Sequence, residues 1–277
     1  MPSDTPRPDF DRPQATKIVC RVFEGFANRL NGIASALSTG RPVSIQWAIN
    51  DHCPASFEDC FRPLDGVEVA NESALAYPHS VSPQKLCWFY PKNVDELPYG
   101  RFRSRMMASY DYLLSRIAVT DWACPAAPAL GCHYRHYLAK PDSFSRYCGW
   151  IRCAVSQLSP ATVHVASDSA DHKSQLLALL ADLQVPTTHN DAPLLDHDLD
   201  RSRANVLGVC RDILSLAECR LGIITNTCRS TVSDPAQARG ALAYATSLED
   251  SPHRSELRDD LFEPRPVEHL LQFHPQT

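Results

Sequence analysis

The feature that most constrains the fold is a strand–turn–helix–strand pattern near the N-terminus. An apolar stretch over 17–22 predicts a strand, and a small-residue turn at Gly25 follows it. A helix is expected from Asn28, and 43–47 predicts a second strand after one short loop. Such a βαβ unit places two parallel strands in one sheet. The turn bares amide groups at the helix start, where a polar ligand can bind, although an ordinary βαβ turn without a ligand has the same pattern.

The C-terminal half alternates between strand and helix patterns more regularly. Strands are expected at 129–135, 162–166, 221–225 and 241–245, and helices at 143–157, 170–183 and 203–217. This alternation predicts a parallel sheet that binds ligands at the carboxyl ends of its strands. Between the halves lie a long irregular region over 51–99, a helix over 104–116 and a Pro-containing linker. We therefore expect a disordered lead-in over 1–16 and two Rossmann-like domains, over 17–124 and 125–277.

Composition excludes several classes of function. The 277 residues carry a formal net charge of −5 and no long basic run, so nucleic acid is not an expected partner. No apolar stretch approaches the roughly 20 residues that span a bilayer, and the first sixteen residues lack the apolar core of a secretory signal. Eleven cysteines occur without a Cys-x-x-Cys pair. We expect a reduced, cytoplasmic protein.

Two polar motifs end predicted strands of the C-terminal half. His133-Tyr134-Arg135 closes the first strand, and Asp168 follows the second. An arginine fork can bind two phosphate oxygens at once, but an arginine paired with a surface carboxylate would have the same sequence pattern. Asp168 could equally cap the following helix. After the strand over 221–225, a hydroxyl-rich turn leads into a helix start, which is the geometry of an anion site.

These motifs, together with Gly25-x-x-Asn28-Arg29, resemble one family, the fucosyltransferases related to the bacterial nodulation-factor enzyme and to the animal core and protein-O-fucosyltransferases. The resemblance covers about 25–61 and 129–232. It implies an α/β, GT-B-like fold with two Rossmann-like domains facing across a cleft. It also implies an inverting, metal-independent glycosyltransferase that transfers fucose from GDP-fucose to a glycan acceptor, with no cofactor besides the donor.

The resemblance also implies roles for individual residues. Arg135 would stabilise the departing diphosphate, because charge stabilisation of this kind often contributes more to catalysis than any other effect. His133 and Asp212 would hold guanine, since a carboxylate can accept both N1–H and N2–H. Asn28 and Arg29 would line the acceptor or sugar side. The remaining donor-binding candidates are Asp168, Thr227, Cys228 and Ser230.

The chain departs from the family pattern at several positions. Leu138 stands where the family has an acid, His136 replaces a second arginine, and Cys228 replaces a hydroxyl. Glu24 could be the general base that deprotonates the acceptor, or only a solvated turn residue. These departures leave an alternative open, namely a non-catalytic nucleotide- or glycan-binding protein with the same fold.

Overall fold

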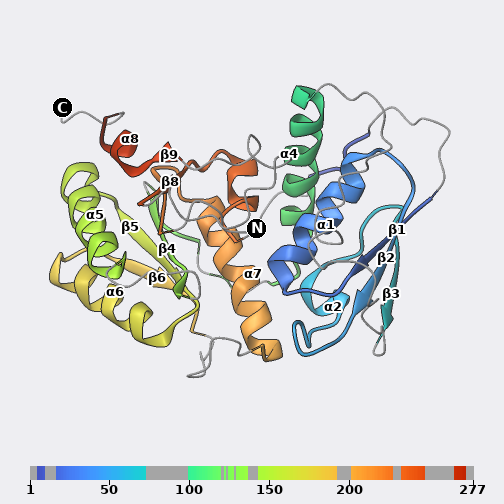
Figure 1. Cartoon of the computed structure of the whole chain (residues 1–277), viewed down its shortest axis with the longest axis horizontal. Coiled ribbons are helices and arrows are strands. Elements are labelled where there is room, and N and C mark those ends of the chain that lie inside the picture. Colours follow the sequence, from blue (N-terminus) through green and yellow to red (C-terminus); the bar gives the residue numbers. More distant parts are fainter. Residues whose placement is uncertain are drawn as a thin grey trace. The chain divides into compact units, whose positions relative to one another are not determined.

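A computed structural model describes ten stretches of the chain: residues 5–9, 17–72, 99–119, 122, 124–127, 129–136, 143–191, 201–226, 232–246 and 265–272. Helices and parallel strands alternate through them (Figure 1). The chain divides into two compact units. The first contains Met1–Asp121 and Arg201–Cys210, and the second contains Trp122–Asp200 and Arg211–Thr277. We describe each unit by itself.

The first unit contains a three-stranded parallel sheet in the order β1-β2-β3. Its strands are β1 (Ile18–Val22), β2 (Val43–Ala48) and β3 (Glu68–Glu72). Helix α1 (Phe26–Ser38) connects β1 to β2, which confirms the predicted βαβ unit. All residues of α1 except Asn28 are buried, because the helix lies between this sheet and α4 (Tyr99–Arg116). A helix that is enclosed on nearly all sides needs small and apolar residues all round, as this one has.

The stretch expected to be irregular contains two short elements. Helix α2 (Phe57–Cys60) is a single turn, stabilised by a capping box between Ser56 and Asp59. Strand β3 has a mostly polar and exposed sequence, so it lacks the apolar alternation that predicts a strand. The prediction of irregular structure is therefore wrong for these two elements. Trp88 and the rest of 73–98 lie outside the described residues.

The second unit contains a six-stranded parallel sheet in the order β6-β5-β4-β7-β8-β9. Its strands are β4 (Ala129–Tyr134), β5 (Thr162–Ser167), β6 (Thr187–His189), β7 (Gly222–Thr225), β8 (Ala243–Ala245) and β9 (Arg265–Pro266). The chain builds outward from β4 through β5 to β6, then returns to the other side of β4 with β7. This is the strand order of dinucleotide-binding folds, in which ligands bind outside the carboxyl ends where the direction reverses. Here that point lies between β4 and β7.

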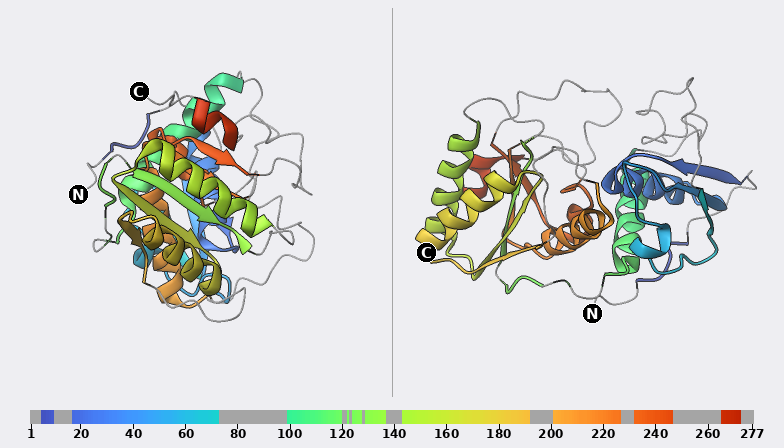
Figure 2. Two further views of the ribbon diagram at one scale, coloured as in Figure 1. Left: turned by 90° about the vertical axis from the view of Figure 1, so that its left-hand side faces the viewer. Right: turned by 90° about the horizontal axis from the view of Figure 1, so that it is seen from below.

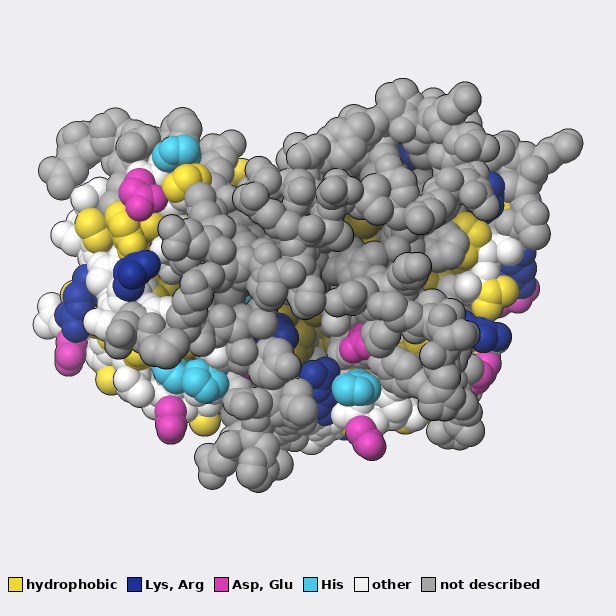
Figure 3. All heavy atoms as spheres, viewed as in Figure 1, with side chains coloured by type: hydrophobic (Ala, Val, Ile, Leu, Met, Phe, Trp, Pro, Cys, Tyr) yellow, Lys and Arg dark blue, Asp and Glu magenta, His cyan; other side chains and the backbone are white. Residues whose placement is uncertain are grey.

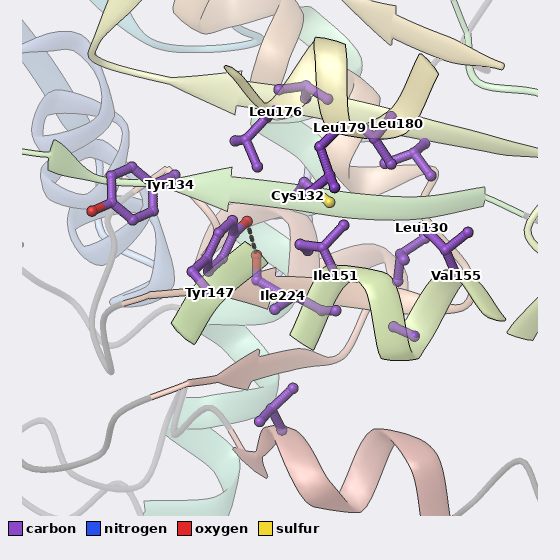
Figure 4. Packing of buried hydrophobic residues seen from close by; sticks show 14 of the residues in the cluster. Leu130, Cys132, Tyr134, Tyr147, Ile151, Val155, Leu176, Leu179, Leu180 and Ile224 are labelled. Atoms are coloured by element: carbon purple, nitrogen blue, oxygen red, sulfur yellow. Dashed lines mark hydrogen bonds between the residues drawn. The ribbon is translucent and has the colours of Figure 1, made fainter. Parts of the chain in front are cut away.

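One face of this sheet is apolar. Leu130, Cys132 and Tyr134 project from β4 into a core shared with α5 (Ser143–Leu158) and α6 (Ala170–Asp182) (Figure 4). The hydroxyl of Tyr147 on α5 donates a hydrogen bond to the carbonyl oxygen of Ile224 at 3.0 Å, so its one polar atom is satisfied inside the core. Helix α8 (Val267–Gln272) packs against α5 and β8, after the short helix η2 (Pro235–Arg239).

The other face carries α7 (Arg203–Ala217), whose second half belongs to this unit (Figure 2). A side-chain Cβ at Gly131 would lie 2.9 Å from Leu216 Cδ2, so the glycine allows α7 to approach the sheet closely. This face also carries two buried histidines, His133 near the carboxyl end of β4 and His164 in the middle of β5. The two buried histidines of this sheet therefore lie on the face covered by α7, and not on the face covered by α5 and α6.

Charged side chains of both signs are scattered over the described surface in the view of Figure 3. Among the described side chains visible in that view, neither sign gathers into a patch. Among the helices described, none has both the length and the apolar character needed to cross a membrane.

Candidate functional site

The carboxyl ends of β4 and β7 are joined by one side chain, that of Asn226. Its Oδ1 accepts a hydrogen bond from the backbone N–H of Arg135 at 2.7 Å, and its Nδ2 donates to the backbone oxygen of Arg135 at 3.0 Å. The buried amide thus continues the hydrogen bonding between β4 and β7 beyond their last paired residues, His133 and Thr225. Sequence analysis missed Asn226. A polar residue directly after a buried strand is the only sequence signal that marks it.

Arg135 lies beside Asp168 at this edge of the sheet. Arg135 Nε is 3.6 Å from Asp168 Oδ2, and Asp168 Oδ1 accepts a hydrogen bond from the backbone N–H of His136 at 2.6 Å. Among the described residues, Arg135 Nε is buried without a hydrogen-bond partner, whereas the side chain as a whole is 30% exposed. Asp168 therefore holds the guanidinium by charge and leaves its Nε–H donor unused.

Asp168 does not cap the next helix. The N-cap of α6 is Ser169, whose hydroxyl accepts a hydrogen bond from the backbone N–H of His172. The capping alternative for Asp168 is thus wrong, and its carboxylate instead faces the end of β4.

His133 is the second side chain here with a nitrogen that has no hydrogen-bond partner among the described residues. It is 4% exposed, and its Nδ1 has no hydrogen-bond partner among the described residues. Burial, then the charge of Arg135 and the proximity of His164, lower the pKa of His133 to about 3, so the ring is neutral at physiological pH. A buried nitrogen without a partner costs roughly 1–3 kcal/mol. Such an atom at a strand end is typical of a site that a ligand completes.

Asp212 lies in a buried polar network on the same side of the sheet. It is 6% exposed; Oδ1 is 3.1 Å from Nε2 of His164, and Oδ2 accepts a hydrogen bond from Nδ2 of Asn190 at 2.7 Å. Lys173 Nζ donates to the backbone oxygen of Asn190. Burial lowers the pKa of Lys173, while the negative charges of Asp212 and Asp191 oppose that shift. Both oxygens of the predicted guanine-binding carboxylate therefore already have one protein partner.

Arg29, in the first unit, has a different environment from the one expected. Its side chain is 1% exposed and donates to the backbone oxygens of Phe23 at 2.9 Å and Ala48 at 2.5 Å, to that of Glu24, and to Asn50 Oδ1 at 3.1 Å. The guanidinium also lies over the Trp47 ring, 4.5 Å from its centroid. This corrects the expectation that Arg29 lines the acceptor side. The carbonyls at the ends of β1 and β2 need donors, and Arg29 supplies them.

The other residues of the first turn lie nearer to solvent. Asn28 and Glu24 are both half-buried, and their predicted roles in acceptor binding and proton transfer stay predictions. A Cβ at Gly25 would lie 2.4 Å from Nη1 of Arg201, which donates to the backbone oxygen of His52 at 3.4 Å. The space beside Gly25 is thus filled by the guanidinium of Arg201, which belongs to the same unit.

Three predicted donor-binding residues, Thr227, Cys228 and Ser230, lie outside the described residues. Their predicted contacts with the donor stay predictions. Within the part of the chain that the structure describes, no group of three or more His, Cys, Asp or Glu side chains could hold a metal ion.

Comparison with known proteins identifies the fold. No protein-family model matches the chain, and no curated protein sequence matches it significantly. The fucosyltransferase NodZ from Bradyrhizobium, in its selenomethionine form, is 19% identical with a TM-score of 0.53, and the match covers 87% of this chain and 98% of that one. The chain has the NodZ fold. A structure of NodZ α-1,6-fucosyltransferase soaked with GDP-fucose matches with a TM-score of 0.51 and 17% identity, over 86% of this chain and 97% of that one.

The GT-B-like α/β fold expected from the motifs is therefore confirmed. At these identities the likeness to NodZ concerns the fold, and the chemistry must be argued from the residues of this chain. Within the NodZ fold, two described side chains at the switch point keep nitrogen atoms without hydrogen-bond partners, His133 and Arg135. They mark the candidate site.

Proposed function

We propose that this chain is an inverting, metal-independent glycosyltransferase that transfers fucose from GDP-fucose to a glycan acceptor. One observation carries the proposal. His133 Nδ1 and Arg135 Nε, which have no hydrogen-bond partner among the described residues, lie at the carboxyl end of β4, beside the point where the strand order reverses. That is where α/β sheets bind nucleotides. The NodZ structure soaked with GDP-fucose shares the fold and supports the choice of donor.

The proposed reaction is a single displacement. A base removes the proton from an acceptor hydroxyl, the oxygen attacks the anomeric carbon of fucose, and the bond from that carbon to the diphosphate breaks with inversion. Negative charge then grows on the departing GDP. Arg135 is placed to neutralise that charge, because its Nε–H donor has no hydrogen-bond partner among the described residues and lies 3.6 Å from the Asp168 carboxylate. Glu24 is the proposed base, and Asn28 is proposed to contact the acceptor.

The test is turnover with defined donors. Purified protein is incubated with GDP-fucose and a panel of glycan acceptors, and release of GDP is measured together with transfer to the acceptor. GDP-mannose and UDP-N-acetylglucosamine serve as donor controls. We expect transfer from GDP-fucose, and the same rate in EDTA as without it. Binding of GDP without consumption of any GDP-sugar would favour the non-catalytic alternative, and transfer from the UDP-sugar would overturn the choice of donor.

A further inference from the structure

The buried network around Asp212 gives each oxygen of the carboxylate one hydrogen-bond partner among the described residues. A carboxylate has about four acceptor positions on its two oxygens. His164 occupies one position on Oδ1 at 3.1 Å, and Asn190 occupies one on Oδ2 at 2.7 Å. The two donors thus engage the two oxygens symmetrically. Among the described residues, no second donor occupies the remaining acceptor position on either oxygen.

We propose that His164 and Asn190 are positioning residues that orient the carboxylate of Asp212, so that the site selects a purine with two adjacent N–H donors. This inference rests on the proposed function. Guanine presents N1–H and N2–H side by side, hypoxanthine presents only N1–H, and adenine presents an acceptor at N1. A carboxylate held with one free position on each oxygen binds guanine with two hydrogen bonds and hypoxanthine with one.

The orientation of His164 is fixed from both sides. Because the carboxylate of Asp212 accepts, His164 Nε2 must carry the proton and donate. His164 Nδ1 lies 3.0 Å from Oγ1 of Thr188 on β6, which anchors the other edge of the ring. The ring is 1% exposed. A histidine that donates to a carboxylate while a second group holds its other nitrogen is a common way to fix a functional side chain.

Asn190 is also fixed at two points. Its side-chain amide donates to Asp212, and its backbone oxygen accepts from Lys173 Nζ. The positive charge of Lys173 lies near enough to Asp212 for the two charges to attract each other. Lys173 therefore attracts Asp212 and holds the backbone of Asn190, whose side chain donates to Asp212.

His164 also connects Asp212 to His133. His164 pairs in register with Gly131, and His133 pairs with Ala166, so the two histidines are diagonal neighbours on one face of the sheet. His133 carries the unpartnered Nδ1 described above. His164 thus adjoins both side chains proposed to hold the base, Asp212 through a hydrogen bond and His133 as a diagonal neighbour in the sheet.

The experiment measures nucleotide selectivity. Dissociation constants of GDP, IDP and ADP are determined by calorimetry for the wild type, and for His164→Leu, His164→Gln and Asn190→Ala. We expect the wild type to bind GDP at least about 10-fold more tightly than IDP, which corresponds to one charge-assisted hydrogen bond. In His164→Leu and Asn190→Ala this ratio should fall towards one. His164→Gln should restore most of it, because the glutamine amide can donate in place of Nε2.

Two controls separate positioning from damage to the fold. Thr162→Val removes a buried hydrogen bond, from Thr162 Oγ1 to the backbone oxygen of Pro186, on the same strand as His164. It should lower stability and leave the GDP/IDP ratio unchanged. Binding of inorganic pyrophosphate, which has no base, should be the same in all folded variants. If His164→Leu fails to fold, Asn190→Ala and His164→Gln still decide the question, because Asn190 is only half-buried and glutamine keeps the donor.

The outcomes distinguish this inference from the proposed function. A GDP/IDP ratio that is the same in the wild type, His164→Leu and Asn190→Ala would overturn the positioning role while GDP binding itself stands. Equal affinity for GDP and IDP in the wild type would do the same. If the wild type binds none of the nucleotides, the proposed function fails, and this inference fails with it.

Discussion

Two arginines that follow strands have opposite environments in this protein. Arg29, after β1, is 1% exposed and donates to three backbone oxygens and one side-chain amide. Arg135, after β4, is 30% exposed and keeps a buried Nε–H donor without a partner among the described residues. The family resemblance implied a ligand-binding role for both, Arg29 in the glycine turn and Arg135 at a strand end. Within this pair, the hydrogen bonds already made to the protein, and not the motif, mark Arg29 as structural and leave Arg135 as the candidate binding arginine.

The largest effect on stability should come from Arg29. Arg29→Met keeps the length of the side chain but removes the donors for the carbonyls of Phe23 and Ala48. Leaving these buried acceptors unsatisfied should lower the free energy of unfolding by about 3–5 kcal/mol. Urea denaturation measures the change. A variant as stable as the wild type would show that Arg29 is not the structural member of the pair.

In contrast to Arg29, Arg135 should be needed for activity and not for stability. Arg135→Ala should reduce transfer from GDP-fucose by about 100–1000-fold, because the charge that develops on GDP loses its counter-charge. Arg135→Lys should recover little of the rate, since an ammonium lacks the planar fork. Rates come from GDP-release kinetics, and urea denaturation checks that the fold is intact. Retention of more than half of the wild-type rate by the alanine variant would contradict the assignment.

His133 should make the second unit sensitive to acid. The pKa of His133 is about 3 in the folded protein, against 6.5 for an ordinary histidine. Below about pH 6.5 the unfolded chain therefore binds a proton that the folded protein does not, and stability falls as the pH falls. Between pH 7 and pH 5 the loss should be about 2 kcal/mol, at about 1.4 kcal/mol per unit below pH 6.5.

A variant isolates this contribution. In His133→Asn the acid-dependent loss assigned to His133 should disappear, and urea denaturation at pH 7 and pH 5 gives the difference between the two proteins. Parallel pH dependences in the wild type and the variant would show that His133 takes up a proton as readily in the folded protein as in the unfolded chain.

Asn226 should show the smallest of the four expected effects. Asn226→Leu removes two hydrogen bonds to the backbone of Arg135 and should cost about 1–2 kcal/mol. Because the backbone of Arg135 would no longer be fixed, transfer should fall as well, though by less than in Arg135→Ala. Denaturation and kinetics on the same preparation test both expectations. A fall in stability with full activity would mean that Asn226 serves the sheet and not the site.

Much of the fold was predictable because its long elements carry a clear apolar period. Helix α7 begins and ends where the sequence predicts, at 203 and 217, and β4 and β5 each agree within one residue. The strands that were missed, β3, β6 and β9, are mostly polar or very short. Pairing to neighbours in the sheet stabilises them, and no local pattern reports such pairing.

The candidate site was predictable only in part. His133 and Arg135 follow an apolar run, so their position at a strand end could be derived from sequence. The roles of Asn226 and His164 depend on which strands lie side by side, and that register is a tertiary property. The burial of Arg29 depends on where the chain brings the carbonyls of β1 and β2, which the turn motif does not encode.

The two hydrogen bonds between the Asn226 side chain and the backbone of Arg135 have a consequence for when the site can form. Asn226 and Arg135 are separated by 91 residues, and the chain from α5 to α7 is synthesised between them. Contacts between residues so distant in sequence form late, since the intervening chain must first be ordered. A ribosome-bound chain that ends before β7 has the His-x-Arg segment but cannot fix its backbone. Under the proposed function, nucleotide binding would thus require that β4 and β7 have paired. A partly folded chain would not bind the donor.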